Sequence, residues 1–129
     1  MNQLIDLVKV FIEKTEQPSS NTPIIPDNKL AQFRYNLMKE ELDEFLTAVE
    51  NKNSTEILDS LVDQLYVLLG TAITCGVSDA LVLGFLEVHR SNMTKVQEDG
   101  TILRDGNGKV SKPPGYRPPD LERILLEIY

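Results

Sequence analysis

Residues 55–75 read TEILDSLVDQLYVLLGTAITC. From Leu61 to Ile73 this stretch is apolar around almost the whole helical circumference, which predicts a helix buried on most of its surface. One carboxylate, Asp63, lies inside the apolar run. An ionised carboxylate among apolar side chains must be paired, bound to a metal or protonated, because its desolvation is otherwise too costly. The stretch therefore predicts the core helix of the fold and a polar site on it.

Helical periodicity continues on both sides of this core helix. We expect three further helices and a short final one, over about 2–16, 28–50, 79–97 and 121–128. In the first of them Leu4, Leu7, Val8 and Phe11 lie on one apolar face. Polar residues suited to N-caps precede the other helices: Asp27 or Asn28, Ser54 or Thr55, Ser78, and Asp120.

The last part of the chain has a different pattern. Residues 105–108, Asp-Gly-Asn-Gly, favour a turn with positive φ and predict a small hairpin. Prolines at 113, 114, 118 and 119 then impose an extended path. We therefore expect one all-α, four-helix-bundle-like domain over 1–129, with a helical core over about 2–97 and a Pro-rich arm over about 98–129.

Composition excludes several classes of protein. A chain of 129 residues is long enough for one core without disulfides, and its single cysteine cannot form one internally. The formal net charge of −7 makes non-specific nucleic-acid binding unfavourable. The longest apolar run, 65–70, is shorter than a membrane span, and the first residues lack a secretory pattern. We expect a cytoplasmic protein that binds neither membrane nor nucleic acid.

An apolar stripe on the helix over 28–50 changes to acidic residues. It begins at Leu30 and continues into Glu41 and Glu44, which are three residues apart and can reach a common point. Glutamate-rich helix faces are usually solvated, and this reading stays open for the pair. Asp63 favours the alternative, in which these carboxylates share an enclosed site, because its neighbours leave little room for a solvated face.

Further polar residues continue the same pattern. Glu56 and Asp59 precede Asp63 on the core helix, and the apolar stripe of the next helix continues into Asn92 and Lys95. Clustered carboxylates without histidine or cysteine favour a hard, oxygen-binding cation such as Mg²⁺ or Mn²⁺.

These residues match a known signature. Glu41-Leu-Asp-Glu44, then Glu56-Ile-Leu-Asp59 and Asp63, resembles the Glu-x-x-Glu … Glu-x-x-Asp pattern of the all-α NTP pyrophosphohydrolases. That superfamily includes the MazG-like proteins and phosphoribosyl-ATP pyrophosphohydrolase. The resemblance spans nearly the whole chain, through three more segments: Arg34-x-x-Leu37-x-x-Glu40-Glu41, Asn92-Met93-x-Lys95 and Lys112-Pro-x-x-Tyr116. One departure is Ser60, where a common form of the family has glutamate.

The resemblance implies a MazG-type fold, a Mg²⁺ cofactor that Mn²⁺ can replace, and a nucleotide substrate. Water would attack between the α- and β-phosphates and release the monophosphate and pyrophosphate. Glu41, Glu44 and Asp63 are the expected ligands, and the remaining ligand stays open between Glu56 and Asp59. One of the first two glutamates is also a candidate general base through water.

Five further residues are candidates for substrate binding. Lys95 would contact a phosphate with Asn92 beside it, although alone it would read as an ordinary helix-end lysine. Lys112 could bind phosphate and Tyr116 could stack on a base; alternatively the arm only packs on a neighbour. Arg34 could anchor a phosphate, but a structural ion pair is the favoured role.

Three functions remain open from the sequence. The first is a Mg²⁺-dependent nucleoside triphosphate pyrophosphohydrolase. Its core helix is too apolar for one short bundle to cover, so we expect a homodimer or homotetramer. The second is a non-catalytic helical module that binds nucleotide or metal, which Ser60 supports. The third is a phosphoribosyl-ATP pyrophosphohydrolase.

Overall fold

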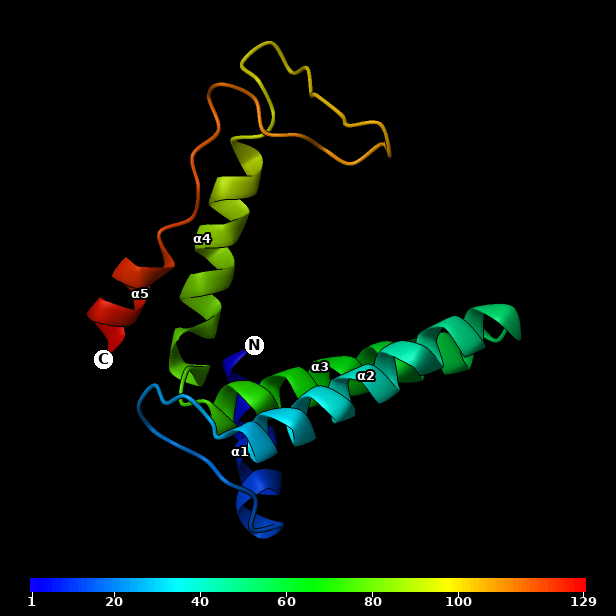
Figure 1. The fold of residues 1–129 in the computed structure, drawn as a ribbon, viewed down its shortest axis with the longest axis vertical. Coiled ribbons are helices and arrows are strands. Elements are labelled where there is room, and N and C mark those ends of the chain that lie inside the picture. Colours follow the sequence, from blue (N-terminus) through cyan, green and yellow to red (C-terminus); the bar gives the residue numbers. More distant parts are fainter. The chain divides into compact units, whose positions relative to one another are not determined.

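The computed structural model describes residues 1–129 and contains five α-helices, one short 3₁₀ helix and no strand. The expected all-α class is confirmed (Figure 1). The elements are α1 (Asn2–Lys14), α2 (Asn28–Glu50), α3 (Ser54–Thr74), η1 (Ser78–Ala80), α4 (Leu81–Met93) and α5 (Leu121–Ile128). The chain divides into two compact units, Met1–Asp79 and Ala80–Tyr129, and each is described here by itself.

The first unit is a pair of long helices with α1 packed against it. A connection of three residues, 51–53, joins α2 to α3, and the two helices lie side by side along their length (Figure 1). α1 packs on α3 and buries Ile5, Val8 and Ile12, which recur at helical spacing. Of the apolar face predicted for α1, Val8 is buried, whereas Leu4, Leu7 and Phe11 are exposed, so the prediction was wrong for these three.

The helix starts are set by short polar side chains. The side chain of Asp27 accepts a hydrogen bond from the Leu30 backbone N–H, and Asp120 caps α5 in the same way. Asn53 caps α3 by accepting from the Glu56 N–H, so the cap predicted at Ser54 or Thr55 was wrong by one residue. Ser78 lies in η1, and α4 begins without a side-chain cap.

The connection between α1 and α2 is fastened to the carboxyl end of α3. The Ser20 N–H donates to the Ile73 carbonyl, and the Thr74 hydroxyl donates to the Pro18 carbonyl. Gly76 follows with φ of 72°, and a Cβ there would collide with the Thr22 carbonyl. Only glycine fits this crossing without strain.

α3 is only partly buried within the chain. Leu69, Ala72 and Ile73 are buried, whereas its amino-terminal two thirds exposes apolar side chains: Leu58, Leu61, Val62, Leu65, Tyr66 and Leu68. A single copy of the chain therefore covers only part of this helix, as expected from its apolar composition. By length and composition α3 could also cross a membrane, a property that core helices of soluble proteins share.

The second unit joins α4 to α5 through an extended arm. Glu87 on α4 is buried, and its carboxylate binds the Arg90 guanidinium and the Asp120 N–H at the start of α5. The expected hairpin is reduced to two isolated bridges, Val96 with Ile102 and Arg104 with Val110. The boundary between the two units thus precedes the fourth helix, whereas the sequence pattern changes after it.

Candidate functional site

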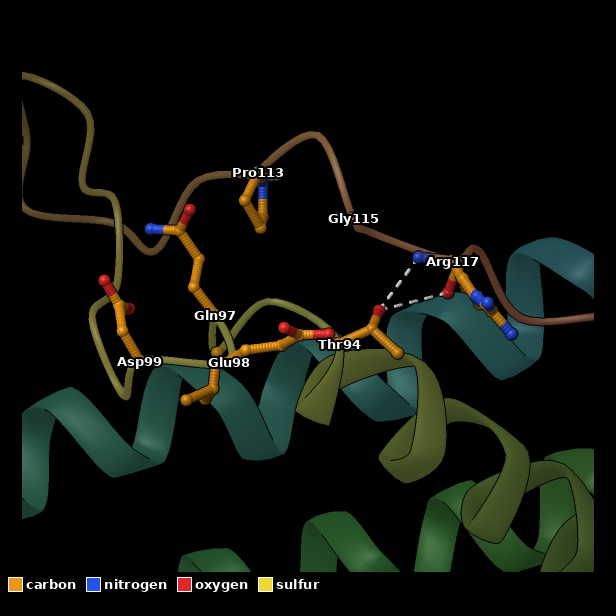
Figure 2. Close-up of a pocket in the computed structure, with 8 residues that line it drawn as sticks. Thr94, Gln97, Glu98, Asp99, Pro113, Gly115 and Arg117 are labelled. Atoms are coloured by element: carbon orange, nitrogen blue, oxygen red, sulfur yellow. Dashed lines mark hydrogen bonds between the residues drawn. The ribbon is translucent and has the colours of Figure 1, made fainter.

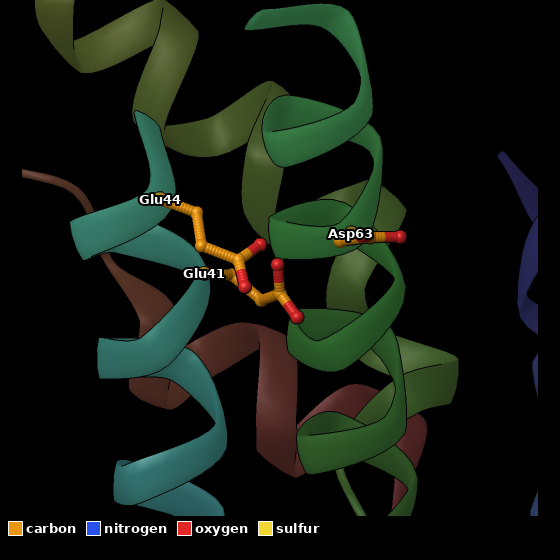
Figure 3. A group of neighbouring side chains, drawn as sticks. All are labelled: Glu41, Glu44 and Asp63. Atoms are coloured by element: carbon orange, nitrogen blue, oxygen red, sulfur yellow. The ribbon is translucent and has the colours of Figure 1, made fainter. Parts of the chain in front are cut away.

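Three carboxylates from two helices meet in the first unit. Glu41 and Glu44 extend from α2 toward α3, which carries Asp63 (Figure 3). One oxygen of each lies within 4.8 Å of an oxygen of the other two. The spacing of three on α2 places its two glutamates on one face, and the side-by-side packing of α2 and α3 brings Asp63 to them.

The proximity of these groups disfavours their charged forms. Burial raises the pKa of Glu41 to about 7, with further contributions from a hydrogen bond to Glu44 and from the charges of Glu44, Asp63 and Glu40. Burial, Asp59 and Glu44 likewise raise the pKa of Asp63. Like charges this close cannot all be ionised at low cost without a cation.

The donor set fits a hard divalent cation. The Oε2 atom of Glu41 is buried and has no hydrogen-bond partner. None of the three carboxylates forms an ion pair with lysine or arginine. Three oxygen ligands without nitrogen or sulfur match the preference of Mg²⁺ and Mn²⁺, and the unpartnered buried oxygen of Glu41 is free to bind such an ion.

The other carboxylates of the signature lie outside this group of three. Glu56 and Asp59 are exposed on α3, about two turns and one turn before Asp63, and their assignment as ligands remains a prediction. Ser60 is only 1% exposed, and its hydroxyl donates to the Ile57 carbonyl. Position 60 therefore offers no carboxylate, unlike the common form of the family pattern.

Arg34 is buried without a charged partner. Its Nε donates to Thr71 Oγ1, Nη1 donates to Gln17 Oε1, and Nη2 donates to the Val67 carbonyl, at 2.9–3.1 Å. Burial lowers the pKa of Arg34. The expected ion pair is therefore absent; the guanidinium instead joins α2, α3 and the α1–α2 connection through neutral acceptors.

The remaining predicted residues lie in the second unit, where three of them come together. The ammonium groups of Lys95 and Lys112 lie 6.0 and 5.1 Å from the centre of the Tyr116 ring. Asn92 is exposed on α4. Roles for these residues in substrate binding remain predictions.

Each unit contains a cavity next to residues predicted for the site. In the second unit a cavity of about 660 Å³ lies between the end of α4 and the arm. There the Arg117 backbone N–H donates a hydrogen bond to the Thr94 hydroxyl (Figure 2). In the first unit a smaller, apolar cavity of about 290 Å³ lies beside the Arg34 guanidinium.

Sequence reasoning missed the residues of that smaller cavity. It combines aromatic side chains of three helices, Phe11 from α1, Phe33 from α2 and Tyr66 from α3. From their spacing alone, each of these aromatic residues is predicted to be an ordinary core residue. The signal that could have indicated a pocket is an arginine beside an apolar stripe, Arg34, about two turns before Glu41.

Comparison with known proteins agrees with this geometry. The family model of phosphoribosyl-ATP pyrophosphohydrolase matches residues 8–92, about two thirds of the chain, including all three clustered carboxylates. The chain belongs to the phosphoribosyl-ATP pyrophosphohydrolase family. No curated protein matches the chain significantly. Membership of this family, within the MazG-like all-α superfamily, supports a hydrolase that cleaves an acid anhydride of a nucleotide.

Proposed function

We propose that this protein hydrolyses a nucleoside triphosphate, NTP or dNTP, to the monophosphate and pyrophosphate in a Mg²⁺-dependent reaction. The observation that carries the proposal is the convergence of Glu41, Glu44 and Asp63 with an unpartnered buried oxygen. When bound, Mg²⁺ (or Mn²⁺) would offset phosphate charge and lower the pKa of a coordinated water. The family match supports the class of reaction.

The residues divide the chemistry as follows. Glu41, Glu44 and Asp63 would hold the cation, and Asp59 or Glu56 is the candidate for a further ligand. The water oxygen forms a bond to the α-phosphorus, while the bond from that phosphorus to the α–β bridging oxygen breaks. Pyrophosphate leaves with the electron pair, and one carboxylate of the Glu41–Glu44 pair accepts the water proton.

Positive side chains of the second unit serve the substrate in this proposal. Lys95 and Lys112 both lie against the Tyr116 ring, so two ammonium groups are available to one polyphosphate. Asn92 would donate a hydrogen bond to the same group. The exposed apolar residues of α3 support assembly into a homodimer or homotetramer that covers them.

The test is pyrophosphate release from a panel of NTPs and dNTPs with Mg²⁺. Glu44→Gln and Asp63→Asn are each expected to lower kcat/KM by about 100-fold or more. The matched control is Glu50→Gln, an exposed glutamate on α2 outside the cluster, which should retain wild-type activity. Absence of turnover on every substrate would contradict the proposal, as would full activity of both cluster variants.

The second candidate is phosphoribosyl-ATP as substrate, which the name of the matching family favours. It is included in the same panel. A kcat/KM for phosphoribosyl-ATP at least tenfold above that of every NTP and dNTP would select this candidate.

A non-catalytic module is the third candidate. Ser60, which replaces a glutamate of the family pattern, supports it. It predicts that Mg²⁺ and nucleotide raise the melting temperature without release of pyrophosphate.

A further inference from the structure

The apolar cavity of the first unit has the size and walls of a site for a flat ring. Its volume of about 290 Å³ is at the lower end of the roughly 300–1,000 Å³ typical of ligand pockets. Phe11 and Tyr66 line it as an edge-to-face pair with ring centres 5.6 Å apart, and Phe33 also lines the cavity. All three rings are partly exposed, so they are not fully covered by other core residues.

A buried cation adjoins this apolar space. Arg34 is 4% exposed, lines the cavity and has no carboxylate partner. Its three hydrogen bonds use three of the five N–H groups of a guanidinium. Gly70 makes room for it, because a Cβ there would lie 2.6 Å from Arg34 Nη2. A buried donor with unused N–H groups favours a ligand that brings acceptors.

The cavity and the carboxylate cluster lie along the same seam between α2 and α3. On α2, Leu37 lines the cavity and precedes Glu41 by four residues, a rise of about 6 Å on the same helix face. On α3, Tyr66 and Val67 line the cavity three and four residues after Asp63. The two sites are thus separated by about one helical turn, a distance that a pentose spans between its base and its first phosphate.

We propose that this cavity binds the nucleobase of the substrate, stacked against Phe11, Phe33 and Tyr66, and that Arg34 selects bases with a keto group at the edge it faces. The assignment of the base to a substrate rests on the proposed nucleotide hydrolysis. It places the base in the first unit, in contrast to stacking on Tyr116.

The selectivity follows from what a guanidinium can offer. It has donors and no acceptor, so it pairs with O6 and N7 of guanine or hypoxanthine and with O4 of uracil or thymine. Adenine and cytosine present an amino group at the equivalent position, which would direct N–H toward N–H. The other nearby polar group does not reverse this preference, because Gln17 Oε1 already accepts from Arg34 and its Nε2 donates to Thr15.

Binding of free nucleosides tests the pocket independently of hydrolysis. Saturation-transfer NMR with metal chelated would compare inosine with adenosine and uridine with cytidine, pairs that differ in the keto or amino group and in the proton on the adjacent ring nitrogen. We expect inosine and uridine to bind at least about fivefold more tightly than their partners. In the wild-type protein, transfer to base protons should come from the aromatic protons of Phe11 and Tyr66.

Two variants probe Arg34 by different routes. Arg34→Lys removes the planar fork, and Gly70→Ala displaces the guanidinium while favouring the helix. Either variant should bring the ratio of the affinities for inosine and adenosine to about one, while the circular dichroism spectrum stays that of a helical protein. Phe11→Leu should weaken the binding of all four nucleosides about fivefold or more through lost stacking. Tyr116→Leu should leave their binding unchanged.

Equal binding of keto and amino nucleosides would overturn the selectivity, and nucleoside binding lost in Tyr116→Leu but kept in Phe11→Leu would overturn the location. Either result could occur in a protein that hydrolyses nucleotides normally. Keto-selective binding by a protein without turnover would support the pocket and contradict the proposed hydrolysis.

Discussion

Glu41 on α2 and Asp63 on α3 hold carboxylate oxygens within 4.8 Å of each other, and no basic side chain pairs with either. This arrangement is unfavourable for both ionised groups, because burial and the charges of neighbouring carboxylates raise the pKa of each. Two acidic groups kept close at such a cost indicate a binding function, since a core optimised for stability alone would contain apolar residues there.

The first prediction concerns the pH dependence of stability without metal. The pKa of Glu41 is about 7 in the folded chain and about 4.5 when unfolded. The folded state therefore binds the proton more tightly, so Glu41 makes its full contribution to stability below pH 4.5 and loses it as pH rises through 7. Glu41→Gln cannot ionise, and at pH 8 with chelator its melting temperature should exceed that of the wild type by about 5 °C.

The comparison at low pH is the control for this prediction. At pH 4 both proteins carry a neutral side chain at position 41, and their melting temperatures should agree closely. A difference that stays constant from pH 4 to pH 8 would contradict the assigned pKa of Glu41.

The second prediction concerns metal removal. Addition of millimolar Mg²⁺ to the wild type at pH 7.5 should raise the melting temperature by several degrees, because a ligand of the folded state alone stabilises it. Asp63→Asn should lose most of this increase. Glu50→Gln, which leaves the cluster intact, should keep it; equal responses of all three proteins would show that Mg²⁺ acts elsewhere.

The third prediction concerns acid stability of the second unit. Hydrogen bonds from Arg90 and from the Asp120 N–H hold the pKa of Glu87 down at about 2. Its stabilising contribution is therefore complete above pH 4.5 and is lost as pH falls through 2. Melting followed by circular dichroism should show Glu87→Gln less stable than the wild type at pH 6, with the difference disappearing near pH 2. A difference that persists at pH 2 would mean that the carboxylate charge is not the cause.

The fourth prediction concerns assembly. Leu61 and Leu68 are exposed on α3, and arginine at both positions should prevent a second copy from covering them. Light scattering coupled to size exclusion should give the wild type a mass of at least twice 14.5 kDa and the double variant the mass of one chain. Leu126→Arg, at an exposed leucine of α5, is the control. A monomeric wild type would contradict the prediction.

The helices and the three carboxylates could be predicted because both depend on local spacing. Periodicity located all five helices to within a few residues at most ends, and the break in the stripe at Glu41 identified the face that meets Asp63. The cap of α3 was misplaced because serine, threonine and asparagine are all good caps and stand in a row at 53–55.

What could not be predicted depends on which elements pack together. The buried face of α1 is centred on Val8, and its choice over the face of Leu7 is decided by the contact with α3. The partners of Arg34 come from three separate segments, so sequence spacing could not show that all of them are neutral. The aromatic cavity could not be predicted for the same reason, because its side chains come from three separate helices.

The buried hydroxyl of Ser60 limits how firmly the site can grip an ion by itself. Mg²⁺ prefers six oxygen ligands, and the three clustered carboxylates would supply three if each bound through one oxygen. In the proposed site, a polyphosphate would therefore add ligand oxygens of its own. Ion and nucleotide should then strengthen each other's retention, so that the protein keeps neither for long without the other.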